Sequence, residues 1–155
     1  MRLEHVPFDH PDAVALRTAQ QAYGDELYAS DPASAHRSAS EELDPASVIF
    51  TVVAYDGDRP VGHACLRRLS GEMAGDLEIK RMFVEPDVRG GGIADALLAA
   101  VEERARAEGV PRVVIHTGDR QLAALRFYGR HGYTPIEVFP PYEAVTYSRC
   151  FEKVF

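Results

Sequence analysis

The sequence has no tryptophan, only two cysteines and no long apolar run, and these absences exclude several classes of protein. Cys65 and Cys150 lie far apart in no disulfide-like framework, so a reducing cytoplasm is the expected location. The longest apolar-rich run, residues 48–54, is far too short to cross a membrane. The N-terminal residues 1–12 lack the apolar core of a signal peptide. We therefore expect no membrane partner.

An excess of positive charge is also absent, because 24 acidic residues outnumber 17 Lys and Arg and give a net charge of −7. Proteins that bind nucleic acids usually carry a basic patch, so nucleic acid is not an expected partner. An acidic surface favours cationic small substrates, although solubility explains it equally well. With 155 residues, of which 46% are hydrophobic, the chain is expected to form a single domain over residues 1–155.

Hydrophobic periodicity and turn residues divide the chain into strands and helices. Two apolar, β-branched runs flank Asp56-Gly57-Asp58, which is a strong hairpin signal. Asp119 is the expected N-cap of the last helix. We predict strands over residues 2–8, 47–55, 59–69, 75–86, 111–117, 133–139 and 144–155, and helices over residues 10–28, 35–43, 92–108 and 119–132. This order implies a mixed sheet with helices on both faces and a right-handed β-α-β unit.

The predicted helix over residues 92–108 carries an apolar stripe that should face the sheet. Its charged residues form two pairs at i,i+4 spacing, Glu102 with Arg106 and Arg104 with Glu108. We expect both pairs to lie on the outer face of the helix.

Three consecutive glycines, Gly90, Gly91 and Gly92, join the strand over residues 75–86 to this helix. A glycine turn at a helix N-terminus favours anion binding, because unpaired N–H groups and the positive end of the helix dipole meet there. Arg89 adds a positive charge. A P-loop is excluded because no Lys-Ser/Thr pair follows, and the dinucleotide fingerprint fails because Asp95 stands where a small residue is needed.

Residues 89–94 read R-x-x-G-x-A, which resembles the acyl-CoA pyrophosphate loop of the GNAT superfamily of N-acetyltransferases. A second signature of that family, A-x-x-x-Y followed by a Gly-aromatic pair, is similar to Ala124 to Tyr128 and Gly132-Tyr133. The likeness covers residues 76–153, and Gln121 departs from it because family members often have Asn there. The resemblance implies an α/β (α+β) fold with a mixed, mostly antiparallel sheet of six to seven strands. This sheet would be splayed at its parallel pair, with helices on both faces.

The resemblance also implies acetyl-CoA as co-substrate, no metal, and a set of residues that hold the cofactor. The expected cofactor-binding residues are the strand backbone and the glycine turn with its flanking helix positions: Met82, Phe83, Val84, Arg89, Gly90, Gly91, Gly92, Ile93, Ala94, Gln121 and Ala124. The amide near Val84 could polarise the thioester carbonyl.

Two residues are expected to move protons in this reaction. Tyr128 is the candidate acid for the leaving thiolate, because a phenol has an ordinary pKa near 10. Glu78 is the candidate base, because period two places it on the face of Met82. The alternatives are a core role for Tyr128 and an ion pair with a nearby Arg or Lys for Glu78.

The acceptor site is expected between the first helices and the loop before the last strand, where Glu26, Tyr28 and Tyr142 could hold an amine. Ordinary surface positions are the alternative for each. His63 and Cys65 share a strand face but lack a third ligand at recognisable spacing, so no metal site is expected. The final strand could contribute to the edge of a homodimer.

The favoured function is direct transfer of an acetyl group from acetyl-CoA to a primary amine of a small molecule or peptide, in a ternary complex. A non-catalytic acyl-CoA-binding or sensing module is the alternative, and a dinucleotide-binding protein is a third. Tyr128 discriminates between the first two, because only an enzyme needs its proton.

Overall fold

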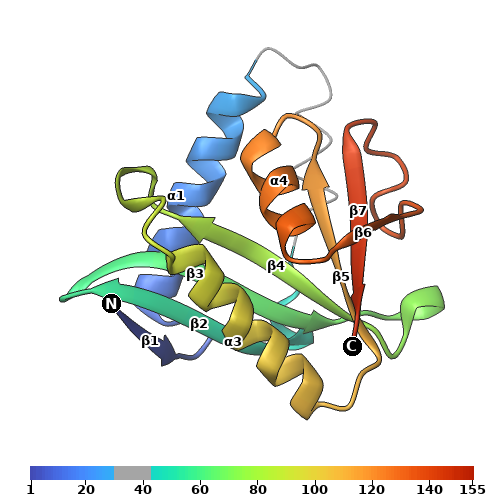
Figure 1. Ribbon diagram of the computed structural model, residues 1–155, viewed down its shortest axis with the longest axis horizontal. Helices are drawn as coiled ribbons and strands as arrows, with labels where there is room; N and C mark the ends of the chain where they lie inside the picture. Colours follow the sequence, from blue (N-terminus) through green and yellow to red (C-terminus); the bar gives the residue numbers. More distant parts are fainter. Residues whose placement is uncertain (30–42) are drawn as a thin grey trace.

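The computed structural model describes residues 1–29 and 43–155, and in these ranges it has seven strands and three helices (Figure 1). Three short 3-10 turns, at Pro45–Ser47, Gly71–Met73 and Pro86–Val88, join some of them. The strands are β1 (Arg2–His5), β2 (Val48–Asp56), β3 (Arg59–Arg68), β4 (Leu77–Val84), β5 (Arg112–Gly118), β6 (Thr134–Ile136) and β7 (Ser148–Val154). The helices are α1 (Pro11–Leu27), α3 (Ile93–Ala107) and α4 (Leu122–Arg130).

The seven strands form one sheet in the order β1-β2-β3-β4-β5-β7-β6. Only β4 and β5 run parallel, and all the other neighbours are antiparallel. Pairing of β4 with β5 begins at Leu77 and Val113 and stops at Ile79 and Ile115. Beyond that point the two strands diverge, which is visible as an open V in Figure 1. The predicted fold, including the splay at the parallel pair, is confirmed.

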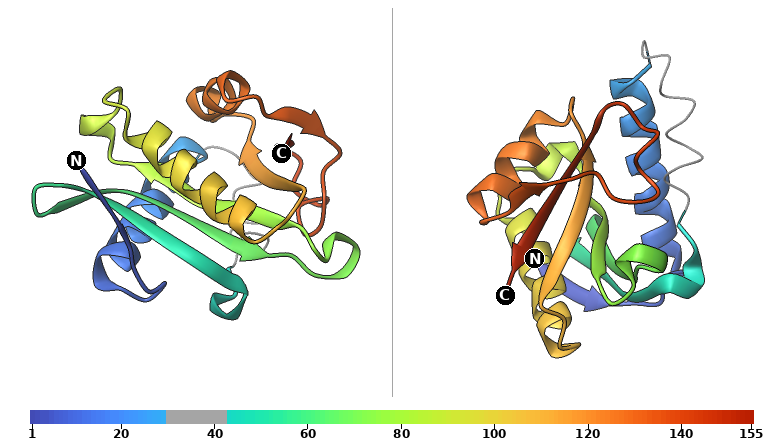
Figure 2. Two further views of the ribbon diagram at one scale, coloured as in Figure 1. Left: turned by 60° about the horizontal axis from the view of Figure 1, so that its bottom comes forward. Right: turned by 90° about the vertical axis from the view of Figure 1, so that its right-hand side faces the viewer.

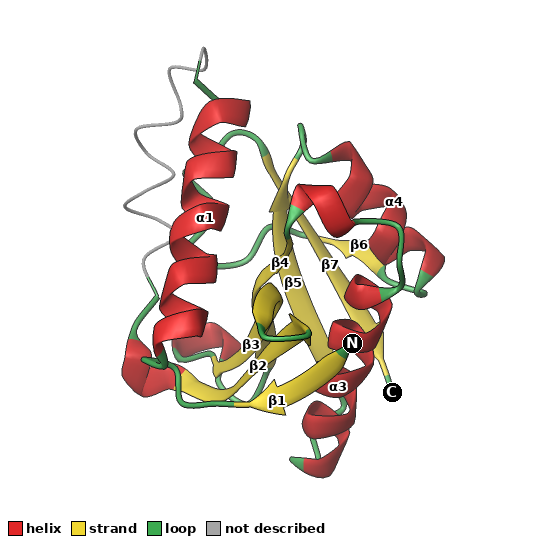
Figure 3. Cartoon of the chain, turned by 90° about the vertical axis from the view of Figure 1, so that its left-hand side faces the viewer, coloured by secondary structure: helices red, strands yellow, loops and turns green. Residues whose placement is uncertain are grey.

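The helices cover both faces of the sheet, with α1 on one face and α3 and α4 on the other (Figures 2 and 3). The apolar stripe of α3, including Leu97, Leu98 and Val101, packs on the sheet in the largest core cluster. Leu16 of α1 packs on the opposite face against Val53 and other buried residues. Burying apolar stripes on both faces is the main stabilising contribution that holds these layers together.

Three local expectations are corrected. Glu102 is buried rather than on the outer face, because it accepts hydrogen bonds from the Tyr133 hydroxyl (2.7 Å) and from the Lys153 ammonium group. Asp119 is not the N-cap of α4, which begins at Leu122 after Gln121 and has no side-chain cap. The last strand is not an edge, because β7 lies between β5 and β6.

Other expectations hold with shifted bounds or lie outside the described ranges. The hairpin turns at Gly57, between β2 and β3, as expected. The strand predicted over residues 133–139 contracts to β6. The short helix predicted over residues 35–43 falls almost wholly outside the described residues. In the described ranges no helix combines the length and apolar character needed to span a bilayer.

Candidate active site

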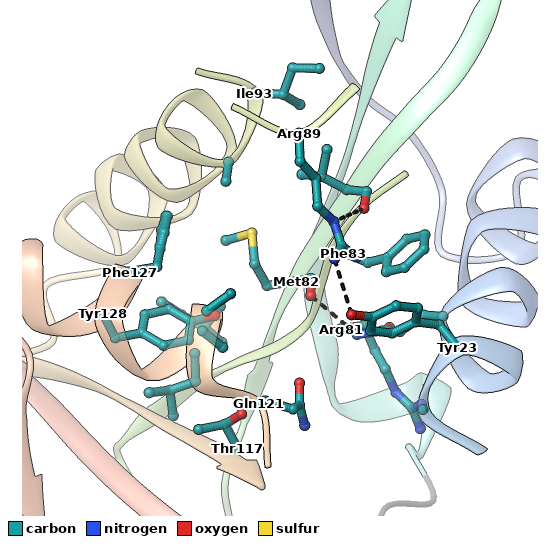
Figure 4. A pocket seen from close by; sticks show the side chains of 18 of the residues that line it. Tyr23, Arg81, Met82, Phe83, Arg89, Ile93, Thr117, Gln121, Phe127 and Tyr128 are labelled. Atoms are coloured by element: carbon teal, nitrogen blue, oxygen red, sulfur yellow. Dashed lines mark hydrogen bonds between the residues drawn. The ribbon is translucent and has the colours of Figure 1, made fainter. Parts of the chain in front are cut away.

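A cavity of about 630 Å³ opens where β4 and β5 separate (Figure 4). One wall comes from α1, including Gln20, Tyr23 and Leu27, and the opposite wall comes from α4, including Phe127 and Tyr128. The end of β4 and the glycine turn (residues 90–92) close one side, and the end of β5 closes another. The cavity therefore lies at the splay, bordered by both parallel strands.

The glycine turn borders this cavity with Gly90 and Gly92 and contains unpaired N–H groups. Gly90 and Gly92 have φ values of 87° and 86°, a region that residues with side chains rarely adopt. Gly92 is the N-cap of α3 and supplies no side-chain cap. Among the described residues no acceptor is bonded to the N–H groups of residues 90–95. These donors, together with the helix dipole, form a site suited to an anionic group.

Arg89 folds back over the rim of the cavity rather than across the turn. Its Nε donates to the Val84 carbonyl at 2.8 Å, and its Nη1 donates to the Tyr23 hydroxyl at 3.2 Å. The guanidinium also lies over the Tyr23 ring, 4.7 Å from its centroid (Figure 4). Arg89 thus links β4 to α1 and keeps a positive charge beside the turn.

The strand β4 contains one extra residue, which divides it into two halves. Cys65 of β3 pairs with Lys80 and His63 with Phe83, so two residues of β4 stand opposite one residue of β3. Arg81, in this bulge, has a φ of 58°. The bulge reverses the alternation of side chains, so residues 77 and 79 share the α3 face with residues 82 and 84. Period two had predicted that Glu78 shares the face of Met82. Because of the bulge, this prediction is wrong.

Beyond the bulge, alternate backbone groups of β4 point into the splay. The hydrogen bond from Glu85 N–H to the Val61 carbonyl (2.8 Å) sets the alternation. The backbone N–H and C=O groups of Phe83 therefore point toward β3, and those of Met82 and Val84 point toward the cavity. Their carbonyls already accept bonds from the side chains of Gln20 and Arg89, at 3.1 and 2.8 Å. By the same alternation, the N–H groups of Met82 and Val84 point away from β3, to the side of the cavity.

Tyr128 extends from α4 into the cavity (Figure 4). Its side chain is almost fully buried, and burial raises its pKa well above the usual value for a phenol. The hydroxyl has no hydrogen-bond partner among the described residues. Tyr128 is therefore a neutral phenol whose proton is available to a ligand in the cavity.

Glu78 lies behind the cavity in a buried polar cluster and does not line it. One carboxylate oxygen accepts from Arg67 Nε at 2.6 Å, and the other accepts from the Tyr142 hydroxyl at 2.8 Å. Lys80, which does line the cavity, donates to the same hydroxyl at 2.6 Å. Glu78 thus forms the ion pair that was its alternative role, and Tyr142 and Lys80 connect it to the cavity.

His116 borders both this cluster and the cavity. Its ring stacks on Tyr142, with centroids 3.7 Å apart and planes inclined by 4°, and its Nε2 lies 2.8 Å from Ser148 Oγ. Burial and the nearby charges of Lys80 and Arg67 lower its pKa to about 3. The imidazole is therefore neutral at physiological pH.

The remaining candidate residues divide between the cavity and the rest of the molecule. The cavity is lined by Phe83, Ile93, Ala94, Gln121 and Ala124 as well, whereas Gly91, Glu26, Tyr28 and Tyr142 do not line it. Tyr28 is fully buried, and its hydroxyl accepts from the Arg120 N–H at 3.1 Å. A Cβ at Gly118 would collide with this hydroxyl, so Tyr28 fills the space beside the end of β5. Glu26 is exposed.

Two features of the site were not foreseen from the sequence. Gln20 holds the Met82 carbonyl, and its buried Oε1 has no partner among the described residues. His63 contacts the carbonyl oxygen of Arg81 in the bulge. The sequence around Arg81 has no glycine or other turn residue that would predict a bulge. Across the described ranges, no group of three or more His, Cys, Asp or Glu is arranged to hold a metal ion.

Comparison with known proteins identifies the family of the chain. The family described as "Acetyltransferase (GNAT) family" matches residues 14–133, well over half of the chain. An IAA acetyltransferase of Azospirillum brasilense is 38% identical over 76 residues, which are 49% of this chain and 50% of that protein. An acetyltransferase of Agrobacterium fabrum is 38% identical over 81 residues, 52% of this chain and 58% of that protein. The chain thus spans about half the length of the curated relatives it matches.

Solved structures share the whole fold. A Klebsiella pneumoniae protein assigned as an acyl-CoA N-acyltransferase aligns with a TM-score of 0.78 and 28% identity, over 99% of this chain and 96% of that one. The PaiA N-acetyltransferase of Thermoplasma acidophilum, solved with coenzyme A, aligns with a TM-score of 0.73 and 14% identity, over 100% of both chains. At that identity, the second likeness shows the fold alone.

Proposed function

The chain belongs to the GNAT family of acetyltransferases, and on this premise we propose that it transfers an acetyl group from acetyl-CoA to a primary amine. The acceptor is a small molecule or a peptide, and the transfer is direct, within a ternary complex. One observation carries the proposal: the same cavity is bordered by the glycine turn at the start of α3 and by the backbone edge of Met82 and Val84 that faces away from β3. Donors at two separated places suit a ligand with an anionic end and a carbonyl end.

The positions of these donors fit the two polar parts of acetyl-CoA, its diphosphate and its thioester. The N–H groups of residues 90–95 would hold its diphosphate, beside the charge of Arg89. The N–H groups of Met82 and Val84 would bind the arm and stabilise the negative charge that develops on the thioester oxygen. The thioester itself supplies the activated acetyl group. Gln121 and Ala124, at the start of α4, would contact the arm from the other side.

Two groups have proton roles in this proposal. Tyr128 gives its proton to the departing sulfur, since its raised pKa keeps the phenol protonated. Glu78 would receive the proton of the amine through two hydrogen bonds: Tyr142 passes its proton to Glu78, Lys80 passes one to Tyr142, and the Lys80 nitrogen takes the proton of the amine. This arrangement replaces direct contact between Glu78 and the amine.

An assay for free CoA thiol tests the proposal, with acetyl-CoA and a panel of polyamines, amino acids, aminoglycosides and Lys or N-terminal peptides. IAA joins the panel because a relative is named for it. Tyr128→Phe should lower kcat about 100-fold while the affinity for acetyl-CoA stays unchanged. Tyr55→Phe is the matched control, because it removes a phenol that bonds Asp12 away from the cavity.

The outcomes separate the functions. Thiol release with at least one amine, lost in Tyr128→Phe and kept in Tyr55→Phe, supports the enzyme. Binding of acetyl-CoA without thiol release on any amine would support the non-catalytic binding module. Affinity for NAD or FAD equal to that for acetyl-CoA would contradict both.

A further inference from the structure

The bulge in β4 requires a strained backbone at a residue that has a side chain. Arg81 has a φ of 58°, a left-handed conformation that is strained for a residue with a side chain. Such a conformation persists only where its surroundings hold it. The strain coincides with the point at which β4 leaves β5, immediately before Met82. The contacts of the Arg81 backbone therefore decide how the end of β4 is presented to the cavity.

His63 of β3 makes the contact that holds this bulge. It is fully buried, and its Nδ1 lies 2.9 Å from the carbonyl oxygen of Arg81. On the other side of the ring, Nε2 lies 3.0 Å from Nη1 of Arg17 in α1. Arg17 is itself fixed, because its second terminal nitrogen donates to the Phe8 carbonyl at 2.6 Å. A chain of hydrogen bonds thus runs from α1 through β3 to β4.

The donors in this chain determine the tautomer of His63. A guanidinium has no acceptor, so Arg17 must donate and Nε2 must accept. The proton of the neutral ring then sits on Nδ1, where it donates to the Arg81 carbonyl. Burial lowers the pKa of His63 to about 4, and the charges of Arg17 and Arg81 act in the same direction. The ring is therefore neutral and can make both bonds at physiological pH.

We propose that His63, oriented by Arg17, is a positioning residue that holds the bulge at Arg81 and so directs the N–H groups of Met82 and Val84 into the cavity. The ligand of these N–H groups rests on the proposed function, whereas the contact between His63 and Arg81 does not depend on it. Loss of the contact lets β4 relax toward regular pairing with β3. A shift of one residue exchanges the faces and edges of the strand, so the two N–H groups would turn away from the ligand.

The test compares two ligands on three variants. His63→Leu removes both hydrogen bonds, whereas His63→Asn keeps an N–H near the position of Nδ1. Val53→Ala is the matched control, because Val53 is buried opposite His63 in β2 and bonds neither Arg17 nor the bulge through its side chain. Calorimetry measures the Kd of acetyl-CoA and of 3′-phospho-ADP, the nucleotide half of CoA, which lacks the arm.

His63→Leu should weaken acetyl-CoA binding about thirtyfold, the effect of losing two hydrogen bonds of typical net strength, and leave 3′-phospho-ADP within about twofold. His63→Asn should recover most of the affinity. Val53→Ala should lower the melting temperature and change neither Kd. Equal weakening of both ligands in His63→Leu, or no weakening, would overturn the positioning role.

Imidazole ¹⁵N shifts of the unmodified protein provide a readout that does not depend on ligands or on folding of the variants. We expect His63 to be neutral with the proton on Nδ1, and a proton on Nε2 would overturn the inference. If the unmodified protein binds no acetyl-CoA, the proposed function fails. The imidazole spectrum would still decide whether His63 holds the bulge, so the two failures are distinguishable.

Discussion

The two halves of β4 are built for different purposes. Residues 77–79 are bonded to strands on both sides, and the polar side chains of Glu78 and Lys80 end in a buried cluster. In residues 82–84, β3 is the one neighbouring strand among the described residues, and the cavity replaces β5 on the other side. One inserted residue, Arg81, separates the halves. A single strand can thus be a fixed anchor at one end and an open edge of hydrogen-bond donors at the other.

The first half is tested most severely by Glu78→Gln. This change leaves the buried Arg67 guanidinium without its counter-charge, and breaking a buried pair in this way typically costs about 3–5 kcal/mol. We expect the free energy of unfolding, measured in urea, to fall by that amount. Glu108→Gln is the control, because Glu108 pairs with Arg68 and Arg104 near the surface and should matter far less.

The same variant sharpens the role of Glu78. A large loss of stability, with turnover retained in the folded fraction, would show that the Glu78 carboxylate stabilises the first half of β4 and is not needed for the reaction. Unchanged stability with turnover abolished would contradict the structural role and indicate that Glu78 takes the proton of the amine directly.

A change of pH probes the surroundings of both halves at once, through two buried histidines: His63 of β3 contacts the bulge, and His116 of β5 stacks on Tyr142 beside Glu78. His63, facing Arg17 and Arg81, has a pKa of about 4, and His116, facing Lys80, Arg67, Ser148 and Tyr142, has one of about 3. Both lie below the ordinary value of 6.5 that applies in the unfolded chain.

Because the unfolded state binds these protons first, stability is greatest above about pH 6.5 and falls as the pH drops toward 4. Each histidine contributes a slope of up to about 1.4 kcal/mol per pH unit in this window, so we expect nearly twice that from the pair. Urea unfolding at several pH values measures the slope. His63→Leu should remove about half of it; an unaltered slope would show that His63 does not titrate as described.

The glycine turn and the position of the cavity were the parts of the site that could be predicted from the sequence. Three consecutive glycines between a strand and an apolar-periodic segment have few physical explanations, and the cavity lies where they indicate. The hairpin at Gly57 and the β-α-β unit were equally accessible, because glycine conformation and apolar spacing act locally. The length of β6 was overestimated, since residues 137–139 alternate like a strand and pairing partners are decided elsewhere in the chain.

The bulge could not be predicted, because Arg81 carries no local mark of a left-handed conformation. Its strain is held by His63 and Arg17, which are distant in sequence. Because the bulge reverses the alternation of side chains in β4, every prediction that assumed regular alternation was wrong, including the face assigned to Glu78. Glu102 was misplaced for a related reason: helical spacing offered an exposed pair with Arg106, whereas Tyr133 and Lys153 approach from other elements and bury it.

The glycine turn allows the finest test, because two adjacent glycines differ in what they require. Gly92→Ala forces an alanine into a φ of 86° in otherwise open space, so we expect a stability loss of about 1–2 kcal/mol from conformation alone. Gly91→Ala meets only the Val88 carbonyl at 3.7 Å and has no left-handed φ, so it should cost little or nothing. Acetyl-CoA affinity, measured by calorimetry, should fall more in Gly92→Ala, because residue 92 lines the cavity and residue 91 does not. Equal affinity in the two variants would mean that the ligand does not approach the backbone at the start of α3.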